Sequence, residues 1–306
     1  MNTSAQAASH RTLLIVAFAT VYVVWGSTYL AIRVAVETMP PFLMAGARFL
    51  VAGAMMFVWL RLKGVAMPNR SQWLHATIAG VLMLLGGNGL VVWAEQTVSS
   101  SLAALLVALT PVWFALLDWA RPSGKRPATY TWIGIVVGFA GVALLVTGHN
   151  SSSVNAFHNP WGLAALVLAG LSWAAGSLWS RYNAKPESPW MNAALQMLCG
   201  GAALLLVSAF HGEPARFQFA QVSLRAWLSL LYLVVFGSWI AFSAYVWLLK
   251  VSTPARVATY AYVNPVIAVL LGHLMLDEVL GLRALWAAAI ILAGVIITTL
   301  PKRNGD

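Results

Sequence analysis

One arginine lies deep inside a long apolar segment, and its position implies chemistry more clearly than that of any other residue. Arg48 is the only charged residue between Pro41 and Arg61. If that segment crosses a membrane as a helix, Arg48 lies roughly 5 Å from the bilayer midplane at about 1.5 Å per residue. An arginine at that depth costs about 2.5–3.5 kcal/mol, so its side chain must face a cavity or a partner. Two interpretations stay open: an anchor for an anionic group such as a substrate carboxylate, or a buried pair with a carboxylate or helix carbonyls.

Two further polar residues belong to the apolar segment 73–95. Asn88 lies in the glycine-rich stretch 86–89. Because glycine has no side chain, such a stretch lets a neighbouring helix approach closely or weakens its own helix. Asn88 is therefore a candidate for substrate contact, and the alternative is a hydrogen bond between helices. Glu95 is a candidate carrier of a coupling proton, and the alternative is an interfacial carboxylate already in water.

Aromatic residues make up 11% of the chain and include 15 tryptophans. Several lie well inside the apolar segments, where their rings could wall a cavity for an aromatic, aliphatic or cationic solute. These deep residues are Trp25, Trp93, Trp113, Trp173, Trp239, Tyr245, Tyr260 and Tyr262, and Asn264 adds a polar group beside them. A single ring of this kind is more often part of the packing than of a site. The set therefore predicts a region of the molecule.

The sequence carries no signal for catalysis or metal binding. Its six histidines are isolated, without the paired spacing of a metalloprotease helix, and it has neither a phosphate-binding loop nor a nucleophile elbow. The single cysteine, Cys199, rules out an intramolecular disulfide. The sequence thus predicts no enzyme activity, no cofactor, no metal and no ATP-driven step. An intramembrane enzyme or a non-transporting receptor is the less favoured alternative.

The composition places these residues in a membrane. Of the 306 residues, 60% are hydrophobic and 8% charged, against about 45–50% and about 25% in soluble domains. A spanning helix needs about 20 apolar residues, and the pattern predicts an all-α polytopic protein with ten transmembrane helices and short loops. The predicted spans are 12–32, 40–61, 73–95, 99–120, 129–148, 160–180, 190–210, 226–249, 255–276 and 282–300.

The basic residues predict the orientation. When the N-terminus is placed in the cytoplasm, thirteen lysines and arginines fall on cytoplasmic segments and four on outer segments, Arg48 being inside a span. The four outer residues are Arg33, Arg216, Arg225 and Arg283. Because cytoplasmic loops carry an excess of positive charge, both termini are predicted to be cytoplasmic. The net charge of +10 follows from this asymmetry, and no nucleic-acid partner is expected.

The two halves of the chain repeat each other. Trp25 and Arg33 are eight residues apart, as are Trp173 and Arg181, at an offset of 148. Arg48 then corresponds to Gln196. Five spans per half is an odd number, so the second half, residues 160–300, enters the membrane from the side opposite to the first half, residues 12–148. Such inverted repeats are typical of secondary transporters, with the substrate near the midplane between them.

Two prolines occupy matching places in the two halves. Pro111 and Pro265 correspond at an offset of 154, each near the middle of its span. A proline inside a helix removes one hydrogen bond and kinks the helix. The pair is therefore a candidate for gating, although proline is also common in membrane helices. Gly134 and Gly138 predict close helix packing, and a homodimer seam is one place for it.

Several short motifs resemble the EamA family of the drug/metabolite transporter superfamily, in particular bacterial exporters of the YedA type. They are Trp25-Gly26-Ser27-Thr28, Ser172-Trp173 with Gly176-Ser177, Tyr262-Val263-Asn264-Pro265-Val266 with Glu278, and, for the YedA type, Pro40-Pro41 with Arg48-Phe49, Gly87-Asn88-Gly89 and Asn159-Pro160-Trp161-Gly162. The resemblance covers about residues 12–300. The chain departs from the family at Gly124, where a glutamate corresponding to Glu278 is often found.

The resemblance implies two inverted five-helix repeats around a central cavity in the bacterial inner membrane. It implies export of amino acids, metabolites or drugs, and it makes eight residues candidates for the cavity wall. They are Trp25, Asn88, Trp93, Trp113, Trp173, Tyr245, Tyr260 and Asn264. With Arg48 as a carboxylate anchor, the preferred substrate is an amino acid or similar metabolite. The alternative is a hydrophobic or cationic solute bound by the aromatic residues alone.

Overall fold

The computed structural model describes residues 3–122, 124, 129–146, 159–277 and 281–298, and every regular element in these ranges is helical. The helices in chain order are α1 (Thr3–Val36), α2 (Pro41–Leu62), α3 (Arg70–Gly80), η1 (Val81–Gly89), α4 (Leu90–Ala94), α5 (Ser100–Val107), α6 (Thr110–Trp119), α7 (Thr129–Val146), α8 (Pro160–Tyr182), α9 (Pro189–Phe210), α10 (Glu213–Arg216), η3 (Phe219–Gln221), α11 (Leu224–Tyr232), η4 (Leu233–Phe242), α12 (Ser243–Val251), α13 (Pro254–Val257), α14 (Tyr260–Leu276) and α15 (Leu282–Thr298).

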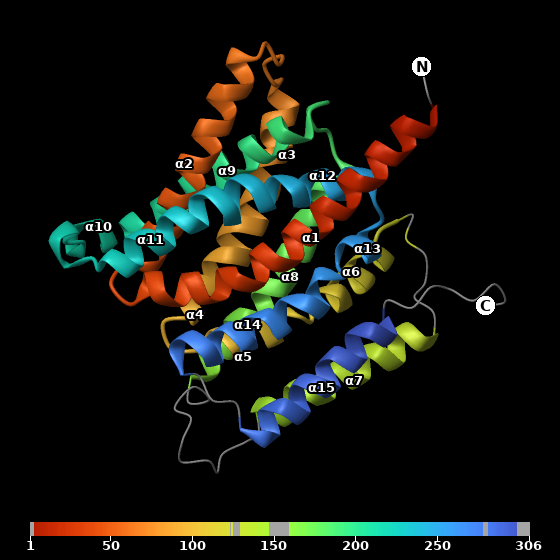
Figure 1. Cartoon of the computed structure of the whole chain (residues 1–306), viewed down its shortest axis with the longest axis vertical. Coiled ribbons are helices and arrows are strands. Elements are labelled where there is room, and N and C mark those ends of the chain that lie inside the picture. Colours follow the sequence, from red (N-terminus) through yellow and green to blue (C-terminus); the bar gives the residue numbers. More distant parts are fainter. Residues whose placement is uncertain (1–2, 123, 125–128, 147–158, 278–280, 299–306) are drawn as a thin grey trace.

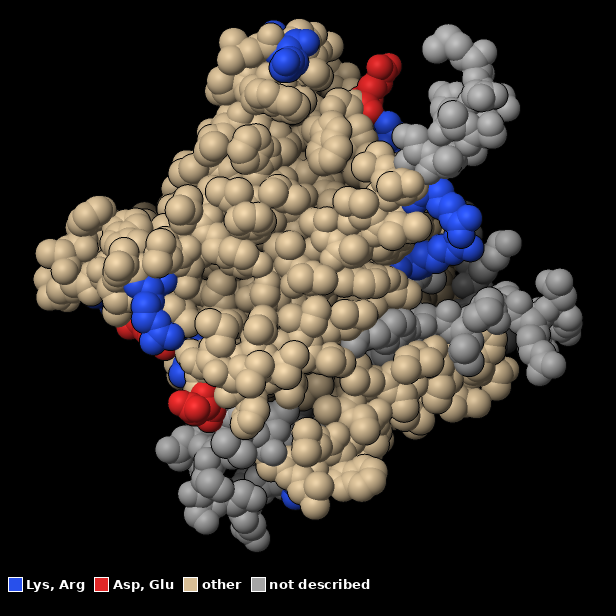
Figure 2. Space-filling model, in the orientation of Figure 1, with Lys and Arg blue, Asp and Glu red and all other residues tan. Residues whose placement is uncertain are grey.

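Within the described residues, seven helical stretches are long and apolar enough to cross a membrane, and three shorter apolar helices accompany them. The predicted all-α membrane fold is therefore confirmed at this level, while the count of ten spans stays a prediction. Charged side chains gather at the margins of the face shown in Figure 2, and the broad band between them carries none. Large apolar side chains such as Val23, Leu206 and Leu270 are exposed, as expected for a surface in contact with lipid.

Helix starts follow local sequence signals. Proline opens α2, α8 and α9, where its fixed φ fits the first turn and its missing N–H leaves no unpaired donor. The Asn159 side chain accepts from the main-chain nitrogens of Trp161 and Gly162 at 3.1 Å, which satisfies free donors at the start of α8. These signals fix where the chain enters a helix after each short loop.

Helices distant in sequence lie side by side. Figure 1 shows α2 beside α9, and α7 paired with α15 at one edge of the bundle. The second pair is in close contact, because a Cβ atom on Gly294 would meet the Gly138 nitrogen and lie 2.7 Å from the Gly134 carbonyl oxygen. The two glycines thus pack within the chain, as the predicted close packing requires, and a homodimer stays a prediction.

Two spanning helices contain a π-helical segment, η1 and η4. In η1, Gly86 and Gly87 let α8 approach, since Cβ atoms there would lie 3.0 Å from Ser172 Cβ and 2.8 Å from Trp173 Cε3. The Ser172 hydroxyl donates to the Leu82 carbonyl at 2.7 Å. The glycine-rich stretch therefore serves both predicted purposes, close approach and a departure from α-helix. The sequence of η4 has no comparable run of glycines that would predict its π-helical geometry.

The two prolines occupy different places in their helices, and their role in gating stays a prediction. Pro111 is the second residue of α6, after a break at Ala108–Leu109, whereas Pro265 lies inside the continuous α14. The Val107 carbonyl, which a donor at position 111 would normally satisfy, accepts from Thr110 Oγ1 at 2.6 Å. The place of the proline therefore differs, although each span contains a break, at Ala108–Leu109 and at Ala258–Thr259. Glu278 and the predicted boundaries at 148 and 300 lie outside the described residues.

Candidate substrate cavity

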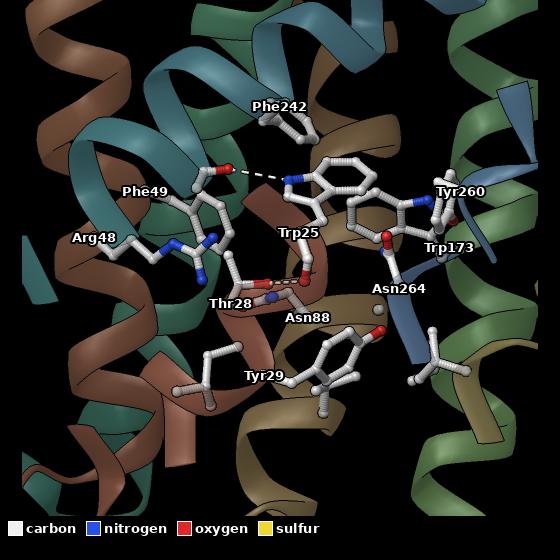
Figure 3. A pocket seen from close by; sticks show the side chains of 16 residues that line it. Trp25, Thr28, Tyr29, Arg48, Phe49, Asn88, Trp173, Phe242, Tyr260 and Asn264 are labelled. Carbon is white, nitrogen blue, oxygen red and sulfur yellow. Dashed lines mark hydrogen bonds between the residues drawn. The ribbon is translucent and has the colours of Figure 1, made fainter. Parts of the chain in front are cut away.

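A small cavity lies where α1, α2, η1, α8, η4 and α14 meet (Figure 3). Six of the candidate residues line it: Trp25, Arg48, Asn88, Trp173, Tyr260 and Asn264. In Figure 3, Arg48 and Phe49 lie on one side, Trp173, Tyr260 and Asn264 on the other, and Trp25 between them. The volume is about 70 Å³, enough for a few water molecules. A solute the size of an amino acid would have to displace lining side chains.

Three wall candidates do not line this cavity. Trp93 is partly buried against the general core, and Trp113 packs edge-on against Phe139 at 5.7 Å between ring centroids. Tyr245 is fully buried behind Trp173, and the Tyr245 hydroxyl accepts a hydrogen bond from Trp173 Nε1 at 2.9 Å. Position along a helix, which the sequence gives, does not fix which side of the helix a ring takes.

The Arg48 side chain crosses from α2 to η4. It is 2% exposed, and its Nε donates to Ser238 Oγ at 2.7 Å. The guanidinium carbon lies 4.6 Å from the centroid of the Phe49 ring, within cation–π range. The Nη1 atom is buried without a hydrogen-bond partner. Arg48 therefore bonds a neutral serine, and one of its buried donor atoms has no partner.

Glu95 is fully buried, so the interpretation as an interfacial carboxylate in water is wrong. It follows the last residue of α4, and its main-chain carbonyl accepts from Arg33 Nη1. Its carboxylate is close enough to act electrostatically on Arg48 and Tyr29. The acidic group therefore belongs to the electrostatic surroundings of the cavity.

Aromatic rings close one end of the cavity. The Trp25 ring centroid lies 5.3 Å from that of Trp173, 4.8 Å from Tyr245 and 5.3 Å from Tyr260, distances typical of favourable aromatic pairs. From this aromatic cluster the cavity extends along α1 past Thr28, Tyr29 and Ile32, toward the C-terminal half of that helix. Trp25, Trp173 and Tyr260 of this cluster thus form part of the cavity wall.

Polar groups hold the elements around the cavity. The Asn264 amide, oriented by its partners, donates to the main-chain carbonyls of Tyr22 at 3.0 Å and Tyr260 at 3.2 Å. The Tyr22 hydroxyl and Thr259 Oγ1 lie 2.5 Å apart. These contacts join α1 to the start of α14. The Asn88 side-chain oxygen, by contrast, has no hydrogen-bond partner and stays available at the cavity.

Sequence reasoning missed several lining residues. Gly237, Phe49, Thr28 and Phe242 line the cavity, and Ser238 bonds Arg48 from behind it. The one available signal was Gly237-Ser238, a small and a polar residue inside an otherwise bulky apolar span.

Comparisons with known proteins agree with this architecture. The model of the EamA-like transporter family matches residues 12–147 and 160–300. An uncharacterized inner membrane transporter of Escherichia coli (strain K12), YedA, is 39% identical over 282 residues, which cover 92% of this chain and 89% of YedA. An uncharacterized transporter of Bacillus subtilis (strain 168), YoaV, is 25% identical over 91% of this chain and 94% of its own length. A crystal structure of a protein 20% identical to this chain matches with a TM-score of 0.65, covering 94% and 97% of the two chains. That likeness shows the fold alone.

Proposed function

Because the chain belongs to the EamA-like transporter family, we propose that it is a secondary-active or facilitative transporter of the bacterial inner membrane. It exports amino acids or other small metabolites or drugs by alternating access, and it is not an enzyme. The multi-pass location is supported by the apolar helices and by the inner membrane relative. The observation that carries the proposal is a buried arginine, Arg48, at a cavity built from both family-matched segments.

The proposed topology has ten helices in two inverted five-helix repeats, with both termini cytoplasmic. The family model matches the chain twice, which supports the repeat. Parallel contacts support it as well. Arg33 donates to the main-chain carbonyl of Glu95, and Arg181 donates to that of Leu249. Each arginine thus reaches the carbonyls at or near the end of a spanning helix that contains a π-helical segment, where a positive charge is favourable.

In this topology the cavity extends toward the periplasmic side, because the C-terminal half of α1 lies there. The aromatic cluster then blocks the cytoplasmic side, and transport requires the two halves to move so that the cluster opens. The non-equivalent positions of Pro111 in α6 and Pro265 in α14 give the two halves different places to bend.

The preferred substrate carries a carboxylate held by Arg48, while Trp25, Trp173 and Tyr260 contact the rest of the solute. Glu95 is the proposed site for a coupling proton, because it is fully buried and its charge reaches Arg48. The aromatic cluster alone favours the second candidate, a hydrophobic or cationic solute. The positive charge of Arg48 in the same cavity disfavours a cation.

Counterflow in proteoliposomes tests the function. Vesicles are loaded with one unlabelled amino acid at a time, and uptake of the labelled compound is followed with wild-type protein and with Arg48→Ala. We expect transient accumulation with the wild type and its loss in the variant, with folding checked by size-exclusion chromatography and circular dichroism. If Arg48→Ala transports as well as the wild type, the carboxylate anchor is wrong. If no amino acid accumulates, cationic and lipophilic solutes are tested next. If the folded protein moves none of these solutes either, the proposed transport function is wrong.

A further inference from the structure

Two residues of η4 hold the Arg48 guanidinium against the helix. Arg48 Nε donates to Ser238 Oγ at 2.7 Å, and Ser238 is fully buried. A Cβ atom on Gly237 would lie 2.8 Å from Arg48 Nη2, closer than real Cβ atoms approach, and 3.0 Å from Thr28 Cγ2, a tight contact. A glycine is therefore needed at position 237 for the guanidinium to rest where it does.

The same helical turn also fixes the neighbouring indole. The Gly237 carbonyl accepts from Trp25 Nε1 at 3.2 Å, so one residue contacts both the arginine and the central ring of the aromatic cluster. The turn belongs to a π-helix, a local geometry frequent at functional sites. Phe49 covers one face of the guanidinium, which leaves the group few orientations.

The Nη1 atom of the same guanidinium is a buried donor without a partner, in a side chain that lines the cavity. Leaving a buried charged donor unpaired is costly, and an oxygen anion in the cavity would remove that cost. Because the acceptor at Nε is an uncharged hydroxyl, this hydrogen bond does not neutralise the charge of the guanidinium. Glu95 acts on that charge from a distance, but it does not occupy Nη1.

We propose that Gly237 and Ser238 are positioning residues that aim the Nη1 edge of Arg48 at the cavity, so that the site takes small organic solutes carrying a carboxylate or another oxyanion. The physiological meaning of this anion site rests on the proposed transport function. Binding of the anion itself is measurable without transport.

Binding to the full-length purified protein tests the site directly. Each amino acid is compared with its α-amide, which lacks the carboxylate, by the shift in thermal unfolding midpoint and by equilibrium binding. We expect at least one amino acid, and not its amide, to bind and stabilise the wild type. Ser238→Ala should weaken that binding about tenfold, which corresponds to about 1.4 kcal/mol. Ser238→Thr, which keeps the hydroxyl, should restore most of it, and Gly237→Ala should weaken it as Ser238→Ala does.

Ser243→Ala is the matched control. Ser243 is fully buried and its hydroxyl donates to Met56 Sδ of α2 at 3.4 Å. Its loss therefore removes a contact between the same two spans without touching Arg48. Equal weakening by Ser238→Ala and Ser243→Ala, or no rescue by Ser238→Thr, would show a general packing effect and overturn the positioning role.

Counterflow separates this inference from the proposed function. A protein that carries a cationic solute and binds no carboxylate would overturn the anion site and leave transport standing. A protein that binds carboxylates through Arg48 and Ser238 but moves none would overturn transport and leave the anion site standing. A protein that neither binds nor moves a carboxylate solute overturns the anion site.

Discussion

The contact between η1 and α8 places Asn88 and Trp173 at the cavity, and a double-mutant cycle can measure it. In Gly86→Ala the new Cβ atom meets the Ser172 hydroxyl and lies 3.0 Å from Ser172 Cβ. Overpacking of this kind costs about 1–3 kcal/mol, and the better helix propensity of alanine offsets up to about 1 kcal/mol of that. We therefore expect Gly86→Ala to lower the free energy of unfolding by about 1–2 kcal/mol.

Ser172→Ala removes the bond from Ser172 Oγ to the Leu82 carbonyl. In a π-helix that carbonyl also accepts from the residue five positions on, here Gly87, so the loss should be that of one ordinary hydrogen bond, about 0.5–1.5 kcal/mol. In the double variant the hydroxyl that blocks the Gly86→Ala methyl group is gone. The loss of stability in the double variant should then be smaller than the sum of the two single losses by about 1 kcal/mol or more.

Equilibrium unfolding of the detergent-solubilised protein measures the four states of the cycle. Gly281→Ala is the control for a glycine replacement, because nothing lies within 4 Å of a Cβ atom there, and it should change stability by less than about 0.5 kcal/mol. Single losses that add within about 0.5 kcal/mol in the double variant would refute the contact. Counterflow by the same variants would show whether a shift of η1 reaches the cavity.

Two further predictions concern packing and topology. Gly294→Leu should separate α7 from α15 and lower the thermal unfolding midpoint. The KM for transport should stay unchanged, because this helix pair lies away from the cavity. A changed KM with unchanged stability would contradict this prediction. In a Cys199→Ser background, Gln218→Cys should react with a membrane-impermeant thiol reagent added to intact cells, and Lys63→Cys should react only after lysis. The reverse labelling pattern would place both termini outside the cytoplasm.

The sequence predicts the membrane helices and Arg48 because both are properties of single segments. An apolar run of about 20 residues becomes a helix wherever it lies in lipid, and a charge inside such a run must face protein or water. The glycines of 86–89 likewise predict the close approach of another helix, which in the structure is α8 at Ser172 and Trp173. These inferences need no knowledge of which helices are neighbours.

The partners of these residues depend on packing between distant segments, and there the sequence was insufficient. Ser238 is 190 residues from Arg48, and neither residue indicates the other. Glu95 lies at the end of its span, where a carboxylate is normally hydrated, yet it is fully buried. Trp93 and Trp113 lie at suitable depths but do not line the cavity, because rotation about a helix axis is set by neighbours that a single sequence does not reveal.

The proposed repeat gives the chain a symmetric scaffold with an asymmetric charge. The position that corresponds to Arg48 in the second half is Gln196, which is buried and donates to Ser180 Oγ at 2.7 Å. The neutral amide donates to a serine of a neighbouring helix in its own half, although its Oε1 atom has no hydrogen-bond partner. Arg48 instead reaches η4 in the other half, and its unpaired atom is a donor. The proposed anion site therefore has no charged counterpart at the matching position of the second half. Because Arg48 belongs to one half and Ser238 to the other, a movement that opens the cavity must preserve or break their bond. If that movement breaks the bond, anion binding and the movement of the halves are linked through it.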